Sequence, residues 1–181
     1  MQDLSIRLPV RTAALQMLLS SPAPQHVLHP VLSSLGRSLS LKQLHDGSFL
    51  IGGGWPGDPS ADRRTCILRP ESIEGNWATA CGLFPAVGEQ HVVRSWCGLE
   101  AENIDAIPFI GSFSGLQGLT IALGFSGHGF ALSPAVGQSV ANHIVGQATP
   151  ELQSLRPDRI STFSAEQVNT FIVTPTTLPA G

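Results

Sequence analysis

The stretch that decides the fold covers residues 118–146 and reads GLTIALGFSGHGFALSPAVGQSVANHIVG. Its first part, residues 118–125, is apolar and predicts a strand. A helix is expected after it, with Ser133 as the N-cap residue and Pro134 at the first helical position. Gly146 is expected to end this helix, because glycine favours the position after a helix C-terminus. The stretch therefore predicts a strand, a glycine-rich loop and a helix.

The loop between these elements, residues 124–130, reads GFSGHGF. Three glycines within six residues let backbone amides approach a ligand closely, so we expect a positive φ at one or more of them. The loop leads into a helix N-terminus, whose free N–H groups and partial positive charge suit an anion or an electron-rich ring. His128 adds a side chain that titrates near neutral pH. From these residues alone, a ligand-binding loop and a tight strand-to-helix turn without a ligand are equal alternatives.

Upstream elements are predicted by turn residues and periodicity. Residues 39–44 and 48–52 flank an Asp-Gly pair, which predicts a hairpin. A helix is expected from Pro70, ending before Pro85. Its buried stripe would consist of Ile73, Trp77, Cys81 and Phe84. Residues 3–20 fit either two strands or a strand and a short helix. Further strands are expected at residues 91–99 and 107–110.

Composition limits the classes of function. The 181 residues suffice for one core, and a net charge of -3 argues against nucleic-acid binding. Only 13% of the residues are charged against 42% that are hydrophobic, so we expect a surface that another polypeptide covers. No apolar run is long enough for a membrane span, and the first residues do not resemble a secretory signal. Three cysteines without a Cys-x-x-Cys pair predict a reducing, cytoplasmic location and no disulfide framework.

Two motifs are rejected as ligand sites. Residues 52–57, GGGWPG, match G-x-G-x-x-G, but the dinucleotide fingerprint needs a helix to begin at once. Pro56 and Pro59 oppose such a helix, so a plain loop is favoured. His26 and His29 lie between prolines in a predicted loop without nearby carboxylates, and no metal site is expected.

The stretch at residues 124–130 strongly resembles the D-amino acid oxidase-like FAD-dependent oxidoreductases. It is most similar to the branch of sarcosine oxidases, glycine oxidase, dimethylglycine dehydrogenases and D-hydroxyproline dehydrogenase-type subunits. Residues 94–100, RSWCGLE, resemble the family pattern R-x-W-x-G-L, and residues 105–111, DAIPFIG, resemble D-x-x-P-x-I-G. Residues 155–159, LRPDR, resemble its closing segment. The resemblance covers nearly the whole chain.

The resemblance implies an α+β or α/β fold with a mixed sheet that lacks the N-terminal FAD-binding βαβ unit. Residues 1–90 would belong to the substrate-binding domain and residues 91–166 to the FAD-binding domain, with a loose tail at 167–181. The implied reaction is hydride transfer from a secondary amine or N-substituted glycine to N5 of the flavin. His128 would be catalytic. The implied FAD-binding residues are Phe125, Ser126, Gly127, His128, Gly129, Phe130 and Ala131.

Departures from the family pattern refine this expectation. Glu100 replaces an arginine that in glycine and D-amino acid oxidases pairs with the substrate carboxylate. Ala131 and Leu50 replace lysines of monomeric sarcosine oxidases, one of which is thought to help activate oxygen, which favours a dehydrogenase. Cys97 is one position away from the cysteine that binds flavin covalently in those enzymes, so noncovalent FAD is favoured.

The resemblance also implies that the chain is the C-terminal half of a longer enzyme. An FAD-binding N-terminal half or partner subunit would then be its partner. Without that partner the chain is expected to be inactive, because nothing in it supplies the nucleotide fingerprint. The alternative is a noncatalytic structural or regulatory piece that packs on a partner and binds no flavin alone.

Overall fold

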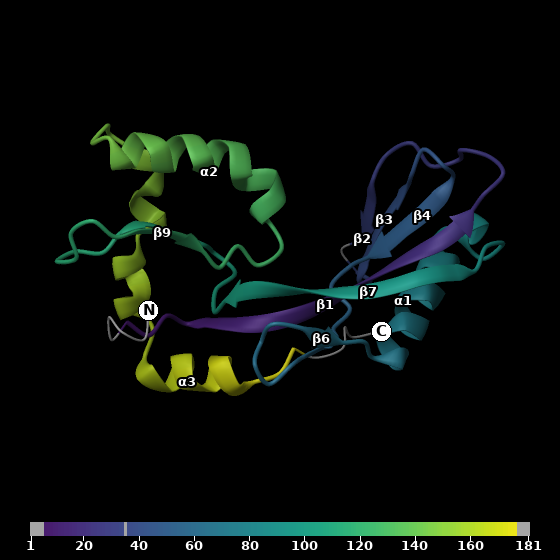
Figure 1. Cartoon of the computed structure of the whole chain (residues 1–181), viewed down its shortest axis with the longest axis horizontal. Helices are drawn as coiled ribbons and strands as arrows, with labels where there is room; N and C mark the ends of the chain where they lie inside the picture. Colours follow the sequence, from purple (N-terminus) through teal and green to yellow (C-terminus); the bar gives the residue numbers. More distant parts are fainter. Residues whose placement is uncertain (1–5, 35, 177–181) are drawn as a thin grey trace. The chain divides into compact units, whose positions relative to one another are not determined.

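A computed structural model describes residues 6–34 and 36–176 of the chain (Figure 1). Its contacts divide the chain into two compact units. Of the described residues, unit 1 combines 6–12 with 100–174, and unit 2 contains 13–34, 36–99 and 175–176. The boundaries near residues 12 and 99 fall inside strands, namely β1 (Val10–Pro22) and β7 (Val92–Asn103). No helix in the described part of the chain is long and apolar enough to cross a membrane.

Unit 2 is built on a sheet with the strand order β2-β3-β4-β1-β7. Strands β3 (Leu39–Gln43) and β4 (Ser48–Gly52) form the predicted antiparallel hairpin, and β2 (Leu32–Ser34) pairs with β3. Residues 10–22 form one long strand, which the sequence left open. The small second sheet consists of β5 (Asp58–Pro59) and β6 (Cys66–Ile67).

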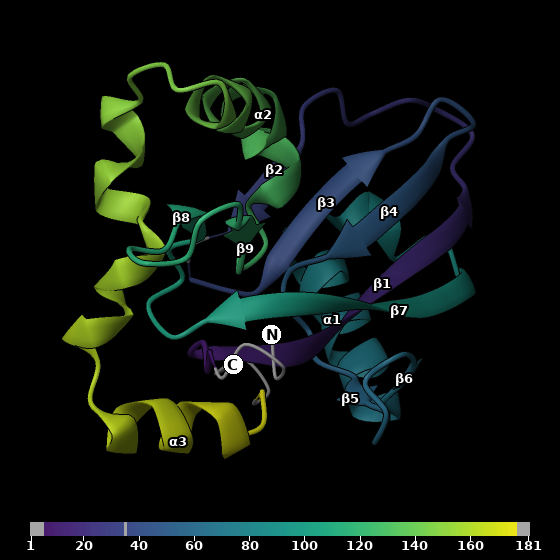
Figure 2. The same ribbon diagram turned by 60° about the vertical axis from the view of Figure 1, so that its left-hand side comes forward.

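Helix α1 (Pro70–Leu83) covers β3 and β4 and closes the core of unit 2 (Figure 2). It begins at Pro70 and ends before Pro85, as predicted. The predicted stripe packs against the core but is only partly buried, whereas Ser72, Asn76 and Ala80 are the fully buried residues of the helix. The side chains at the centre of this core are Leu18, Leu41, Phe49 and Ile51.

A disulfide in unit 2 corrects the expectation drawn from cysteine spacing. Cys66 on β6 is bonded to Cys97 on β7, with the two Cα atoms 6.2 Å apart. The pair was not predicted because its members are 31 residues apart and meet only through the fold. Cys81 is the free cysteine.

Unit 1 contains the antiparallel hairpin of β8 (Phe109–Ser112) and β9 (Thr120–Leu123), against which helix α2 (Gly129–Ile144) packs (Figure 1). Short 3-10 helices follow at Pro150–Leu155 and Pro157–Thr162. Arg159 fastens the second of these to the hairpin, because its guanidinium pairs with Asp105 and lies 4.1 Å from the ring centre of Phe109.

The C-terminal end of unit 1 is helical, in contrast to the loose tail expected from residue 167. Helix α3 (Ala165–Val173) begins with a capping box in which Ser164 and Gln167 bond to each other's backbone. This box satisfies N–H groups that would otherwise lack partners at the helix start, and Val168 is buried. Residues 177–181, also assigned to the tail, lie outside the described residues.

Candidate functional site

The glycine-rich loop lies where β9 ends and α2 begins. Gly124 and Gly127 have φ values of +75° and +88°, which confirms the expectation of left-handed backbone in this loop. Gly129 does not share it, because it is the first residue of α2. Ser126 also has a positive φ of 50°, an uncommon conformation for a residue with a side chain. The loop therefore holds a tight, specific backbone path.

Asn103 at the end of β7 fixes this path. Its backbone N–H donates to Ser126 Oγ at 2.9 Å, and its side-chain Nδ2 donates to the carbonyl of Ile107 at 2.6 Å. The side-chain oxygen of Asn103 accepts the N–H of Ile104 at 2.8 Å. Asn103 is 4% exposed, so these bonds are shielded from water. Sequence reasoning did not select Asn103, since no motif marks an asparagine at a strand end.

Helix α2 begins at Gly129, five residues before the expected first residue, so the prediction of Ser133 as N-cap and Pro134 as first residue was wrong. A proline inside a helix leaves the carbonyl four residues earlier without its donor. Here Ser133 Oγ donates to that carbonyl, of Phe130, at 2.9 Å. The hydroxyl thus replaces the lost bond and lets the helix extend back to the glycine loop.

The start of α2 is open. His128 is its N-cap residue but makes no side-chain cap, and the first bond into the helix joins Leu132 N–H to the His128 carbonyl at 3.2 Å. The N–H groups of the first three residues, Gly129, Phe130 and Ala131, consequently lack an intrahelical acceptor. Together they form a positively polarised donor set that can bind an electron-rich group.

Glu100 on β7 belongs to the same site. Its Oε1 would lie 3.6 Å from a β-carbon placed on Gly127, so the carboxyl group borders the loop directly. Burial raises the pKa of the Glu100 carboxyl above its usual value, and the negative charge of Glu102 adds to the increase. The N–H of Gly127 and the imidazole of His128 act on this pKa in the opposite direction.

The seven predicted residues form one continuous segment, in which residues 125–128 lie in the loop and residues 129–131 form the start of α2. Phe125, Ser126 and Gly129 are partly buried, whereas the remaining four are exposed, and the Phe130 side chain is 97% exposed. His128 is close enough to Glu100 to influence its charge, and its Nδ1 lies 3.3 Å from the carbonyl of Phe125.

A hollow of about 460 Å³ adjoins this turn at Ser126. Its walls come from the end of β7 and the following residues up to Ala106, and from Arg11 and Phe171. The Arg11 guanidinium pairs with Glu102 at 2.8 Å and lies 4.6 Å from the ring centre of Phe171. This cation is therefore already engaged by groups of unit 1.

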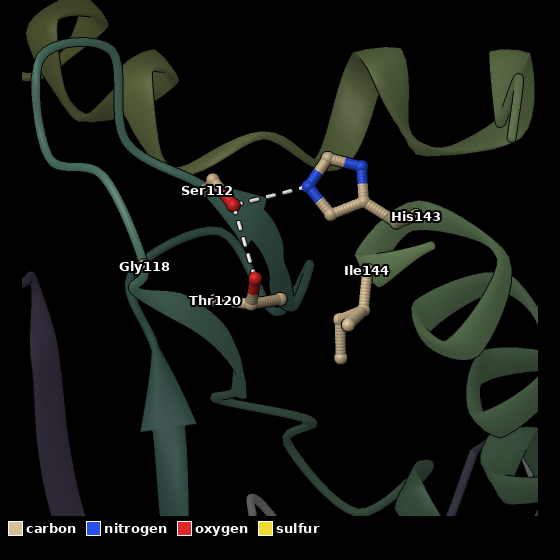
Figure 3. A pocket seen from close by; sticks show the side chains of 5 residues that line it. All are labelled: Ser112, Gly118, Thr120, His143 and Ile144. Carbon is tan, nitrogen blue, oxygen red and sulfur yellow. Dashed lines mark hydrogen bonds between the residues drawn. The ribbon is translucent and has the colours of Figure 1, made fainter. Parts of the chain in front are cut away.

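A second hollow, of about 430 Å³, lies at the other end of α2 (Figure 3). Ser112 Oγ lies 3.0 Å from both His143 Nε2 and Thr120 Oγ1, and Gly118 and Ile144 complete the lining. Ser112 thus bonds to both other polar groups, and among the described residues that line the hollow none is acidic. Sequence reasoning did not select these residues, and their spacing matches no motif considered there.

The rejected motif at residues 52–57 is bonded to β1 through two of its backbone groups. Gln16 N–H donates to the Trp55 carbonyl and Gly57 N–H donates to the Ala14 carbonyl, both at 2.8 Å. The segment therefore pairs with β1, and the next helix begins only at Pro70. The prediction that no helix begins directly after this glycine run is confirmed.

The fold and the loop define a flavoenzyme class. Residues 1–143 match the family described as FAD dependent oxidoreductase (DAO), and the chain belongs to this family. The resemblance stated from residues 94–130 is thereby confirmed.

Particular relatives agree with this assignment. Sarcosine oxidase subunit beta of Arthrobacter sp is 30% identical over 148 residues, which is 81% of this chain and 35% of that protein. Glycine oxidase of Pseudomonas putida is 29% identical over 81% of this chain and 38% of its own length. The chain thus spans little more than a third of these relatives.

Solved structures show the same partial coverage. L-proline dehydrogenase from P. horikoshii superposes with a TM-score of 0.79 and 27% identity, over 90% of this chain and 43% of that one. Glycine oxidase from Geobacillus kaustophilus gives a TM-score of 0.74 at 21% identity, over 84% and 40%. The expected mixed-sheet α+β fold, as one part of the architecture of this family, is confirmed.

Proposed function

We propose that this chain is the C-terminal portion of an FAD-dependent oxidoreductase that oxidises a secondary amine or an N-substituted glycine. The observation that carries the proposal is the tight loop at residues 124–130, which ends on an open helix start in a chain of the DAO family. Bound FAD would supply the oxidising power, by accepting hydride from the carbon next to the neutral amine. The resulting imine would hydrolyse in water.

The site fits the pyrimidine side of a flavin ring. Positive φ at Gly124 and Gly127 removes side-chain bulk from the loop, and the first N–H groups of α2 are donors for ring carbonyl oxygens. Residues 125–131 would hold this side of the ring, and the α2 N-terminus would stabilise negative charge on it. We propose that His128 acts as an acid or base beside the substrate or the ring.

Two features support noncovalent binding and a division of roles. Cys97 is occupied by its bond to Cys66 and offers no thiol to a flavin. We propose that residues 91–166 contribute the flavin contacts and that residues 1–90 form part of the substrate-binding domain. The substitutions at Leu50 and Ala131 support a dehydrogenase, with an acceptor other than oxygen.

The partner we propose is the polypeptide portion that carries the nucleotide fingerprint. Helix α2 supports this, because none of its residues is buried in the described structure although most are apolar. The Phe130 and Ile144 side chains are 97% and 65% exposed. Apolar surface of this extent on one helix is typical of a face that another polypeptide covers.

A noncatalytic role is the second candidate. The glycine run at residues 52–57 favours it for the chain by itself, because no helix begins directly after this run and FAD affinity depends on a pyrophosphate site at a helix N-terminus. The presence of flavin in the assembled protein separates the two candidates.

The test is to purify the tagged chain from cells of its source organism, so that any polypeptide completing the enzyme is recovered with it. We expect about one FAD per chain, seen by absorbance near 450 nm, and reduction of that flavin by a secondary amine without air. An assembly free of flavin, or one whose flavin no amine reduces, would overturn the proposal.

A matched pair of variants assigns the flavin to the loop. Gly127→Val puts a branched side chain at a φ of +88° and should abolish flavin binding. Gly115→Val introduces the same strain at a φ of +86° in the turn between β8 and β9, where a β-carbon meets no atom within 4 Å. Equal flavin content in the two variants would contradict the assignment.

A further inference from the structure

We propose that Glu100 is a specificity-determining residue that selects substrates bearing a second cationic group, so that the amine oxidised is part of a diamine or polyamine. This inference rests on the proposed function and deepens it by choosing between its two substrate classes. It concerns only side chains of this chain, on β7 and in the glycine loop.

Glu100 carries a negative charge, and no cationic side chain of the described residues pairs with it. Its neighbour on the same face of β7, Glu102, is paired with Arg11 at 2.8 Å. The other ion pairs of unit 1 engage Asp105 with Arg159 and Asp158 with Arg156. Within residues 6–34 and 36–176, no lysine, arginine or histidine nitrogen lies within 4.0 Å of the Glu100 carboxylate.

The charge of Glu100 lies beside the proposed flavin loop. The carboxylate borders Gly127 in the middle of the proposed flavin loop and is partly buried. Loss of hydration and repulsion from Glu102 both disfavour its ionised form, while the Gly127 N–H and His128 favour it. A bound cation would relieve this cost, because an opposite charge replaces the lost hydration.

The charge of Glu100 favours one of the two substrate classes over the other. An N-substituted glycine would bring a carboxylate beside the unpaired carboxylate of Glu100, and like charges at short range oppose binding. An amine with a remote ammonium group would instead form a charge-assisted hydrogen bond with Glu100. The neutral amine to be oxidised and the ammonium to be held are then two different ends of the same molecule.

Three probes test this on the flavin-containing assembly: N-methyl-1,4-butanediamine, N-methylbutylamine and N-methylglycine. We expect the diamine to have a kcat/KM about tenfold or more above the matched monoamine, as one charge-assisted bond would give. Calorimetry provides a readout independent of turnover, and 1,4-butanediamine should bind at least tenfold more tightly than butylamine.

Variants then locate the preference. Glu100→Gln removes the charge and keeps the shape, and it should abolish the preference for the diamine while improving N-methylglycine. Glu74→Gln is the control, because it removes the same charge from an exposed position on α1. Glu100→Asp, which keeps the charge, should retain part of the preference.

The outcomes distinguish the two proposals. Lack of flavin, or of oxidation of any probe, overturns the proposed function. Oxidation of the probes with equal kcat/KM and equal affinity for diamine and monoamine overturns only the role of Glu100, and this comparison needs no variant. An unchanged preference in Glu100→Gln does so as well, and would leave Glu100 as the partner of a cation on the polypeptide that completes the enzyme.

Discussion

Glu100 shows how one residue can oppose stability while it prepares a site. An acid whose pKa is raised in the folded state binds its proton more tightly there than in the unfolded chain. The folded state therefore loses stability as the pH rises from the unfolded pKa, about 4.3, through the folded value. Above that window the ionised group is a constant cost to the fold.

This predicts that Glu100→Gln stabilises the purified chain at pH 8. The expected increase in Tm is small, about 1–2 °C, because the group is only partly buried and solvent screens it. The increase should vanish near pH 3, below the unfolded pKa, where the carboxyl is protonated in both states. Calorimetric melting at the two pH values measures this, with Glu74→Gln as the control at an exposed position; a lower Tm at pH 8 would contradict it.

Asn103, in contrast to Glu100, stabilises the fold, because both polar atoms of its buried side chain form hydrogen bonds. Asn103→Ala should remove the bonds to Ile107 and Ile104 and destabilise the chain by about 1–3 kcal/mol. Urea unfolding measures the change. The control Asn142→Ala loses only an exposed bond to Gln138 and should cost about 0.5 kcal/mol or less. Equal losses would show that the side-chain bonds of Asn103 do not stabilise the fold.

At the scale of elements, burial explains which predictions succeeded. The hairpin of β3 and β4 was predictable because Asp46-Gly47 sits between two apolar runs, and Gly47 has a φ of +89°. Strand β1 was ambiguous because its buried face includes Gln16 and Ser20. Gln16 exchanges bonds with the backbone of Arg69, and Ser20 Oγ accepts the Phe49 N–H. Buried polar residues whose hydrogen bonds are satisfied interrupt the alternation of apolar and polar residues from which a strand is predicted.

The candidate site was predictable in part for a related reason. The loop is local, so seven consecutive residues reveal it. The contacts of Glu100 and Asn103 with the loop are not local, because β7 and the loop are more than 20 residues apart in the chain. The start of α2 was misplaced because the side chain of Ser133, taken as a cap, instead compensates for Pro134.

The disulfide between β6 and β7 gives a prediction at this scale. Closing a loop of about 30 residues should stabilise the fold by about 3–4 kcal/mol through the unfolded chain. Dithiothreitol should therefore lower the Tm by about 6–15 °C. The double variant Cys66→Ser with Cys97→Ser should melt at the lower temperature and ignore the reductant. Identical melting with and without reductant in the unaltered chain would exclude the bond.

At the scale of the whole molecule, the described residues include the proposed ring-side loop, but among them the G-x-G-x-x-G match at residues 52–57 is not followed directly by a helix. A few amides and one helix dipole cannot offset an association cost of about 4–15 kcal/mol. The fingerprint-like segment at residues 52–57 cannot help, because two of its backbone groups are bonded to β1.

The purified chain alone should therefore lose FAD during gel filtration and show no amine turnover with a dye acceptor or with oxygen. Adding the polypeptide that carries the fingerprint should restore both. Stoichiometric FAD on the lone chain after gel filtration would refute this prediction.

The bond between Cys66 and Cys97 also makes residues 66–97 a covalent ring that contains the whole of α1. A protease that cuts the backbone once anywhere inside this ring opens it without releasing either fragment. The nicked chain would keep its mass on a denaturing gel without reductant and separate into two bands with reductant. A single cut between β6 and α1, at residues 68–69, would therefore report whether the disulfide had formed in the cell.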